Sequence, residues 1–359
     1  MFRRLCTTAG ALLVSAGVIA TLHADPQQLT LAIVMTNDQT RNAIQVYDAA
    51  THALLQTAST NGQGGAGGNA RGVRQLDGEL FAAVNAGSNT VAIFRRNGNA
   101  LVFEELLPTS SAPESLDFGN DHLYVAGAQT IDSFEVKNHR VGGRDGSAFL
   151  ELVGNLTPPD GSTAQVGVLD SRHVLVTLKT DPTPGTVDVV ALDADGAVQG
   201  SLDGIVGAPA GTLTPFGFAP EGDGTAVITL AHSSQDGLFR NGAFATTIAA
   251  GQAAPCWMTR AGKYLFTANT GSKTISRLVG TGSNVFVDAA VAAPVVTGGA
   301  PADIDTNQGV LGVIDHTATE SHLSLFTYNV TGELTALGSP IALGVTNANG
   351  VAIMVPKVQ

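Results

Sequence analysis

Cysteine, tryptophan and charged side chains are scarce in this sequence. Its 359 residues include 2 cysteines and 1 tryptophan, and only 13% are charged, about half the usual share of ~25%. Cys6 falls in a leader segment described below, so the remaining chain holds Cys256 alone and can form no internal disulfide. A chain of this length can bury a large core without such a bridge.

Basic side chains are scarcer than acidic ones. The chain has 18 Lys and Arg against 30 Asp and Glu, for a formal net charge of −12. This balance excludes a general electrostatic grip on phosphate backbones, so we expect no nucleic-acid partner. Hydrophobic residues make up 44% of the chain, which together with the low charge excludes intrinsic disorder.

Residues 1–24 are typical of a signal peptide. Arg3 and Arg4 precede an apolar stretch from Leu5 to Leu22, and Ala24 offers a small residue for cleavage. An uncleaved anchor is the alternative, and the paired arginines leave ordinary and twin-arginine export both open. No later stretch is apolar enough to cross a bilayer. We therefore expect a secreted or periplasmic protein without a stable membrane span.

The rest of the chain lacks capped helical periodicity and repeats a β-rich pattern. An apolar strand, a polar loop and a second strand recur seven times; the copies begin at Leu31, Leu80, Leu123, Val174, Ala226, Tyr264 and Val310. A further strand precedes most copies and a hairpin follows each one, giving four strands in about 48 residues. This predicts an all-β fold for residues 25–359, a seven-bladed β-propeller with four antiparallel strands per blade. A two-sheet sandwich array is the alternative.

The two ends of the chain predict how the ring closes. The segment Asn349 to Met354 resembles a first strand with no second strand after it, whereas the chain near Leu29 begins with a second strand that lacks its first. We expect the C-terminal strand to pair into the first blade, which removes an open sheet edge. The low aromatic content of 5% argues against a WD40 propeller.

Two repeats carry a family resemblance. The segments AAVNAGSNTVAIF from Ala82 and FTANTGSKTISRL from Phe266 resemble the YVTN repeat of seven-bladed propellers. With the Ala-Pro strands before several repeats, the mature chain resembles the lactonase family, which includes 6-phosphogluconolactonase-like proteins and carboxymuconate cyclases. The resemblance implies a propeller that hydrolyses or isomerises a lactone. The family's catalytic motifs cannot be placed here residue by residue, so no role is carried over from them.

Strand alternation brings two loops of each repeat to one face of the ring, where we expect the ligand site. Candidate catalytic residues on this face are His316 with Asp315, His232 and Glu114. A histidine beside a carboxylate suits general acid–base chemistry. Neighbours in a strand point to opposite faces, however, so Asp315 and His316 can cooperate only in an irregular loop. Exposed loop histidines, and a Glu114 that caps loop amides, are the alternatives.

Candidate substrate-binding residues are Arg71, Lys179, Asn37, Asn85, Asn269, Trp257 and Asp303. The Arg71 guanidinium could bind a carboxylate or a developing oxyanion, or form an interblade salt bridge with an acid such as Glu114. Lys179 could act similarly or pair with Asp181. The asparagines could hydrogen-bond sugars, and Asp303 could hold a cation or cap amides.

Two functions from different classes fit these residues. One is a secreted lactonase-like enzyme acting on a small-molecule lactone at the channel mouth; the other is a noncatalytic propeller that binds a glycan, peptide or protein partner. We predict a monomer with a lactone or carbohydrate-like ligand and no cofactor. A divalent cation bound in the channel stays an open alternative.

Overall fold

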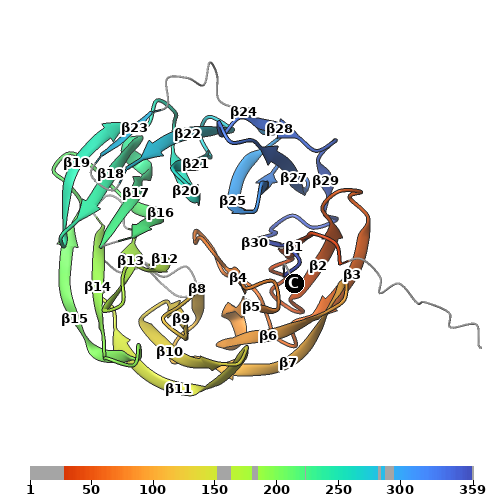
Figure 1. The fold of residues 1–359 in the computed structure, drawn as a ribbon, viewed down its shortest axis with the longest axis horizontal. Coiled ribbons are helices and arrows are strands. Elements are labelled where there is room, and N and C mark those ends of the chain that lie inside the picture. The colour runs from red at the N-terminus through yellow and green to blue at the C-terminus, as the bar shows by residue number, and fades with distance from the viewer. Residues whose placement is uncertain are drawn as a thin grey trace, which may run out of the picture.

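Seven separate antiparallel sheets surround one axis (Figure 1). The computed structural model describes residues 28–151, 163–179, 185–222, 224–281, 284–287 and 295–357. The predicted signal peptide lies outside these residues. Helical structure in the described chain is limited to two 3-10 turns, η1 (Ala86–Ser88) and η2 (Ala231–Ser233). The predicted all-β, seven-bladed propeller is confirmed.

Each sheet is one blade, numbered here along the chain. From the axis outward, the strands of blade 1 are β30 (Val351–Met354), β1 (Leu31–Met35), β2 (Ala43–Asp48) and β3 (Leu54–Ser59). Those of blade 2 are β4 (Val73–Leu76), β5 (Leu80–Asn85), β6 (Thr90–Asn97) and β7 (Ala100–Pro108). Those of blade 3 are β8 (Pro113–Gly119), β9 (His122–Gly127), β10 (Thr130–Lys137) and β11 (Arg140–Phe149).

The next two blades repeat this order. Blade 4 consists of β12 (Thr163–Val168), β13 (His173–Leu178), β14 (Thr186–Leu192) and β15 (Val198–Gly207). Blade 5 consists of β16 (Pro215–Gly222), β17 (Thr225–Leu230), β18 (Gln235–Arg240) and β19 (Ala243–Ala249). The second strands begin within one residue of the predicted repeat starts, because alternating apolar residues and local turn pairs define them.

Blades 6 and 7 differ at the rim, where two short strands replace one outer strand. Blade 6 has β20 (Pro255–Ala261), β21 (Tyr264–Asn269), β22 (Thr274–Gly280), β23 (Val285–Val287) and β24 (Val295–Val296). Blade 7 has β25 (Ala300–Asn307), β26 (Val310–His316), β27 (Ser321–Tyr328), β28 (Leu334–Ala336) and β29 (Ile341–Ala342). In blade 7 the break contains Pro340, which has no amide to donate to the ladder.

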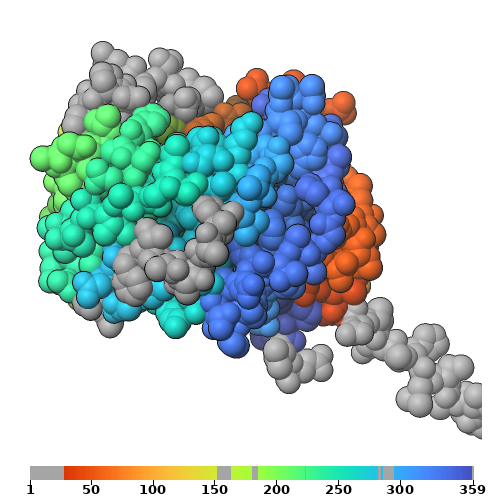
Figure 2. Space-filling view, turned by 90° about the horizontal axis from the view of Figure 1, so that it is seen from above, coloured from red at the N-terminus to blue at the C-terminus, as the bar shows by residue number. Residues whose placement is uncertain are grey.

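The C-terminal strand closes the ring, as predicted. β30 pairs antiparallel with β1 in a register that runs from Leu31 opposite Met354 to Val34 opposite Val351. All residues of both strands are buried. The last blade therefore lies against the first, as the blue and orange-red surfaces show in Figure 2.

Side chains also tie the inner strands of neighbouring blades together. In several blades the residue that directly follows a bulge in the inner strand bonds to the next blade. In blade 7, Asp303 Oδ2 accepts the amide of Val351 at 3.2 Å. In blade 3, Ser115 Oγ accepts the amide of Val166 at 3.0 Å. At the same position in blade 4, Gln165 Oε1 accepts the Phe218 amide at 2.9 Å. These bonds satisfy inner-edge amides that have no strand on that side. These inner-strand side chains are consequently held by both blades they touch.

Candidate functional site

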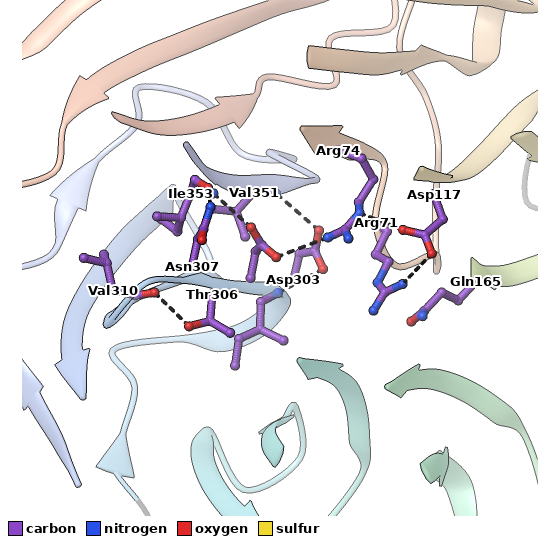
Figure 3. Close-up of polar contacts among 12 residues, drawn as sticks. Arg71, Arg74, Asp117, Gln165, Asp303, Thr306, Asn307, Val310, Val351 and Ile353 are labelled. Atoms are coloured by element: carbon purple, nitrogen blue, oxygen red, sulfur yellow. Dashed lines mark hydrogen bonds and ion pairs between the residues drawn. The ribbon is translucent and has the colours of Figure 1, made fainter. Parts of the chain in front are cut away.

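Five charged side chains converge inside the ring (Figure 3). Four belong to the inner strands β4, β8 and β25, and the fifth lies just before β4. We call Arg71, Arg74, Asp117, Asp303 and Asp305 the charged ring. Arg74 Nε lies 3.1 Å from Asp117 Oδ1, and Arg74 Nη1 lies 3.3 Å from Asp305 Oδ1. Arg71 Nη1 lies 3.4 Å from Asp117 Oδ2. Blades 2, 3 and 7 thus meet through ion pairs, with both arginines between Asp117 and Asp303 in Figure 3.

Backbone geometry fixes the position of Arg71. Its φ is 59°, a left-handed conformation that is uncommon for a non-glycine residue. The Arg71 carbonyl accepts the amide of Leu116 at 3.0 Å, which ties it to blade 3. Its guanidinium lies over the Phe218 ring, 5.9 Å from the centroid, and Nη2 donates to the Phe218 carbonyl at 3.4 Å. Contacts with blades 3 and 5 therefore hold the strained residue and its side chain.

Burial sets the protonation of the ring carboxyls. It raises the pKa of Asp303 to about 7, although the amides of Ile304 and Val351 donate to the carboxylate and oppose the shift. Burial also raises the pKa of Asp305, against the attraction of Arg74. Asp303 is 2% exposed. Asp303 is therefore a carboxyl with a pKa near neutral pH, and its charge acts on the guanidinium groups of both Arg71 and Arg74.

The pKa values of the two arginines shift in opposite directions. Burial lowers the pKa of Arg71, with further repulsion from Arg74. Burial acts the same way on Arg74, but Asp117 and Asp305 outweigh it and raise that pKa. Both groups stay cationic at neutral pH, because an arginine starts from above ~12. Arg71 shares Asp117 with Arg74 and is the cation better placed to accept a further anion.

A glycine-rich segment crosses the ring just before β4. We call residues 61–72 the strap; Figure 1 shows the chain that leads into β4 reaching the middle of the ring. On its way the Gly64 amide donates to Asp38 O of blade 1 at 2.7 Å, and Gln63 O accepts the Gly87 amide of blade 2 at 3.0 Å. The Ala70 amide donates to Ala164 O of blade 4 at 2.8 Å. The strap thus contacts blades on different sides of the axis.

Three of the side chains predicted to lie on the ligand-binding face of the ring bind this strap. Asn37 Oδ1 accepts the amides of Gly65 and Ala66, and Asn37 Nδ2 donates to Ala66 O at 2.8 Å. Lys179 Nζ donates to Gly67 O at 2.9 Å. Glu114 Oε2 accepts the Gly67 amide at 3.3 Å. Three of the predicted side chains therefore meet on one run of backbone.

Asn69 joins the strap to three blades. Trp257 Nε1 of blade 6 donates to Asn69 O at 2.8 Å, and the indole packs edge to face on Phe216 with centroids 5.4 Å apart. Asn69 Nδ2 donates to Glu114 O, and Asn69 Oδ1 accepts from Asn349 Nδ2 at 2.7 Å. The Asn69 side chain is fully buried. Trp257, predicted to bind substrate, is thus bonded to the strap.

Asn85, Asn269 and His232 bond to other parts of the blades, although the Asn85 side chain also packs against Gly62 at the start of the strap. The Asn85 amide is buried at a blade corner, accepting from Asn42 and Thr60. Asn269 Nδ2 donates within blade 6, to Ser276 Oγ at 3.0 Å among others. His232 is exposed on η2, with Nδ1 3.0 Å from Thr214 Oγ1. None of these contacts reaches the charged ring.

Asp315 and His316 belong to one regular strand and face opposite ways. β26 runs through His316, so the irregular loop that cooperation required is not formed there. His316 Nε2 contacts Ala348 O at 2.8 Å. Asp315 is buried, accepts from Ser324 Oγ at 3.3 Å and lies 3.7 Å from Nδ1 of His322, its cross-strand neighbour. The catalytic roles of His316, His232, Asp315 and Glu114 stay predictions.

Three members of the charged ring were not predicted from the sequence. Arg74, Asp117 and Asp305 lie inside inner strands and not at their starts. The available signal was a charged side chain two or three residues beyond a predicted site residue, as from Arg71 to Arg74, Glu114 to Asp117 and Asp303 to Asp305. The interblade salt bridge weighed for Arg71 does form, but its partner is Asp117 instead of Glu114.

Neither a metal-binding cluster nor a membrane-spanning helix occurs among the described residues. Among them, no group of three or more His, Cys, Asp or Glu side chains is arranged to hold a metal ion. In the same part of the chain, no helix has the length and apolar character needed to span a membrane. Asp181, the other partner weighed for Lys179, lies outside the described residues.

Comparison with solved structures finds this fold in proteins that are described as lactonases. The periplasmic gluconolactonase of Pseudomonas aeruginosa is 14% identical, with a TM-score of 0.64 over 91% of this chain and 99% of that chain. A candidate 6-phosphogluconolactonase from Bacteroides fragilis is 13% identical, with a TM-score of 0.62 over 92% of this chain and 99% of that one. No family model and no curated protein matches the sequence.

The comparison establishes the fold and leaves the reaction open. A streptogramin B lyase also matches, with 14% identity and a TM-score of 0.51 over 74% of this chain and 81% of that chain. Lactonase and lyase chemistry thus occur on similar propellers, since function depends on the site placed on a fold. The resemblance to lactonase-like propellers seen in the sequence agrees with these structural neighbours.

Proposed function

We propose that the protein is a lactonase-like hydrolase whose charged ring opens a small lactone inside the propeller channel. The observation that carries this proposal is Asp303, whose pKa is about 7 and whose carboxyl group attracts the guanidinium groups of Arg71 and Arg74 electrostatically inside the ring. A general base works best when its pKa lies near the working pH. The gluconolactonase among the structural neighbours supports the choice of reaction class.

In this proposal Asp303 acts as the general base. Its carboxylate removes a proton from a water molecule, whose oxygen attacks the lactone carbonyl carbon. Arg71 stabilises the resulting oxyanion by charge-assisted hydrogen bonding. The tetrahedral intermediate collapses with cleavage of the bond between the carbonyl carbon and the ring oxygen. That oxygen takes the proton back from Asp303, which leaves an open-chain hydroxy acid and the original carboxylate.

The experiment is a lactone-hydrolysis assay on residues 25–359 with matched variants. We expect Asp303→Asn to lower kcat by about 10²–10⁴-fold, and Arg71→Gln to lower it by about 10²–10³-fold. Asp236→Asn is the control, because Asp236 is equally buried and its pKa is also about 7, but it lies in the third strand of blade 5, away from the channel. Full activity in folded Asp303→Asn would refute the proposed role.

A noncatalytic role is the second candidate, and the strap favours it. Asn37, Lys179, Glu114 and Trp257 all bind strap backbone. A propeller whose mouth residues are engaged in this way suits recognition of a glycan, peptide or protein by its outer surface. No turnover on a broad lactone panel, together with specific binding on a glycan array, would support this role over hydrolysis.

Export is part of the proposal. The signal-peptide pattern in residues 1–24 and the periplasmic neighbour support a secreted or periplasmic protein, acting without its leader. Mass spectrometry of the protein purified from the culture medium or periplasm should give an N-terminus near Asp25. An intact N-terminus on cytosolic protein would contradict it.

A further inference from the structure

The strap occupies the face of the ring at which the inner strands begin. Its residues bond to blade 1 through Asn37, to blade 3 through Glu114, to blade 4 through Lys179 and to blade 6 through Trp257. Ala70, also in the strap, lies in one apolar cluster with residues of five blades, Ala164, Phe216, Trp257, Ala302 and Ala348. A segment held by blades on opposite sides of the axis must pass across the channel.

Glycine allows this passage because parts of the strap touch neighbouring backbone. A Cβ on Gly64 would lie 2.4 Å from the carbonyl carbon of Asn37, and one on Gly62 would lie 2.3 Å from the Asn85 amide nitrogen. Real Cβ atoms do not approach that closely, so a side chain at Gly64 would push the strap away. The glycine run is therefore a fitted element and not only a spacer.

Asn69 is the point where the strap is fastened most heavily. Its three bonds reach Glu114 O, Asn349 Nδ2 and Trp257 Nε1. Two of the three use the side chain, which is fully buried. Loss of that side chain would remove these partners from the Glu114 carbonyl and the Asn349 amide, and a buried polar group that loses its partner weakens the closed arrangement.

We propose that residues 61–72 form a closing strap over this mouth of the channel, latched by Asn69, and that a ligand reaching the charged ring from this face must displace it. The strap then determines which ligands enter. Arg71 lies near the C-terminal end of the strap, so movement of the strap also changes the position of a cation of the charged ring. This inference concerns access to the channel and holds whichever reaction the channel carries out.

Trp257 gives a direct readout because it is the only tryptophan in the chain and its indole donates to the strap. In the closed state it is 8% exposed, so acrylamide should quench its fluorescence weakly. We expect Asn69→Ala and Gly64→Ala to raise the Stern–Volmer constant at least about threefold and to shift emission to longer wavelength. Gln63→Ala is the control, because that side chain is exposed on the same strap.

A second readout follows the charged ring. Phenylglyoxal labelling with peptide mass spectrometry should show Arg71 protected in the wild type and in Gln63→Ala, and labelled several-fold faster in Asn69→Ala and Gly64→Ala. Circular dichroism shows that each variant keeps its sheets, and either latch variant alone suffices if the other does not fold. Unchanged quenching and unchanged Arg71 labelling in a folded latch variant would overturn the proposal. Lactone assays play no part in this test, so its failure is distinct from failure of the proposed hydrolysis.

Discussion

Replacing Asp236 should stabilise the protein strongly at alkaline pH and little at acid pH. Asp236 is the second residue of β18, opposite Thr229, and is fully buried. Neither carboxyl oxygen has a hydrogen-bond partner. The corresponding second residue in the third strands of four other blades is apolar: Val91, Ile131, Val187 and Ile275. Blade 5 thus carries a carboxyl where these four blades bury an aliphatic side chain.

The magnitude follows from linkage between protonation and folding. Burial raises the pKa of Asp236 from 3.8 to about 7, so the folded state binds the proton more tightly than the unfolded state does. The penalty for ionising the buried group is absent below about pH 4, grows as pH rises toward 7 and is complete above it. At about 1.4 kcal/mol for each pH unit between those two values, it reaches about 4 kcal/mol.

Urea titrations followed by circular dichroism test this value. The free energy of unfolding of Asp236→Val minus that of the wild type should be about 3–4 kcal/mol larger at pH 8 than at pH 4. Asp236→Asn removes the charge but keeps the shape, and should show the same dependence on pH. A difference that is equal at both pH values, or a loss of stability at pH 8, would show that ionising Asp236 does not destabilise the folded protein.

Two other predictions concern ring closure and the thiol. Deleting residues 351–359 removes β30, exposes the inner edge of β1 and removes the groups bonded to Asp303 and Asp305. We expect this variant to lose the cooperative thermal transition and to aggregate, as seen by size-exclusion chromatography. A monomer with an unchanged melting temperature would contradict closure of the ring by β30. Burial raises the pKa of Cys256 to about 11, so at pH 8 the folded chain of residues 25–359 should react with iodoacetamide about 100-fold more slowly than the same chain in urea. Equal rates would show that the thiol is accessible.

The fold was predictable because its signals are local. Turn pairs and period-two alternation define each repeat, and the unpaired strand segment at Asn349 to Met354 identifies the closing partner of β1. Arg71 and Asp303 were also predictable, since they lie near the starts of inner strands on one face.

The remaining site depends on contacts between distant segments. Arg74, Asp117 and Asp305 look like ordinary strand residues until three blades bring both carboxylates within 3.3 Å of the Arg74 guanidinium. The glycine run resembles a flexible linker in the sequence. Only the close approach of Gly64 to Asn37, and the reach of Asn69 to Trp257, identify it as a fitted strap.

We propose that the charged ring is the functional site and that Asp303 is its titrating group. The most direct measurement is kcat/KM for a hydrolysed lactone across about pH 5 to 9. Because the carboxylate is the active form and its pKa is about 7, the rate should rise with pH through a midpoint near 7, and Asp303→Asn should abolish that rise. A profile that is flat across this range, or a midpoint that survives in folded Asp303→Asn, would contradict the account.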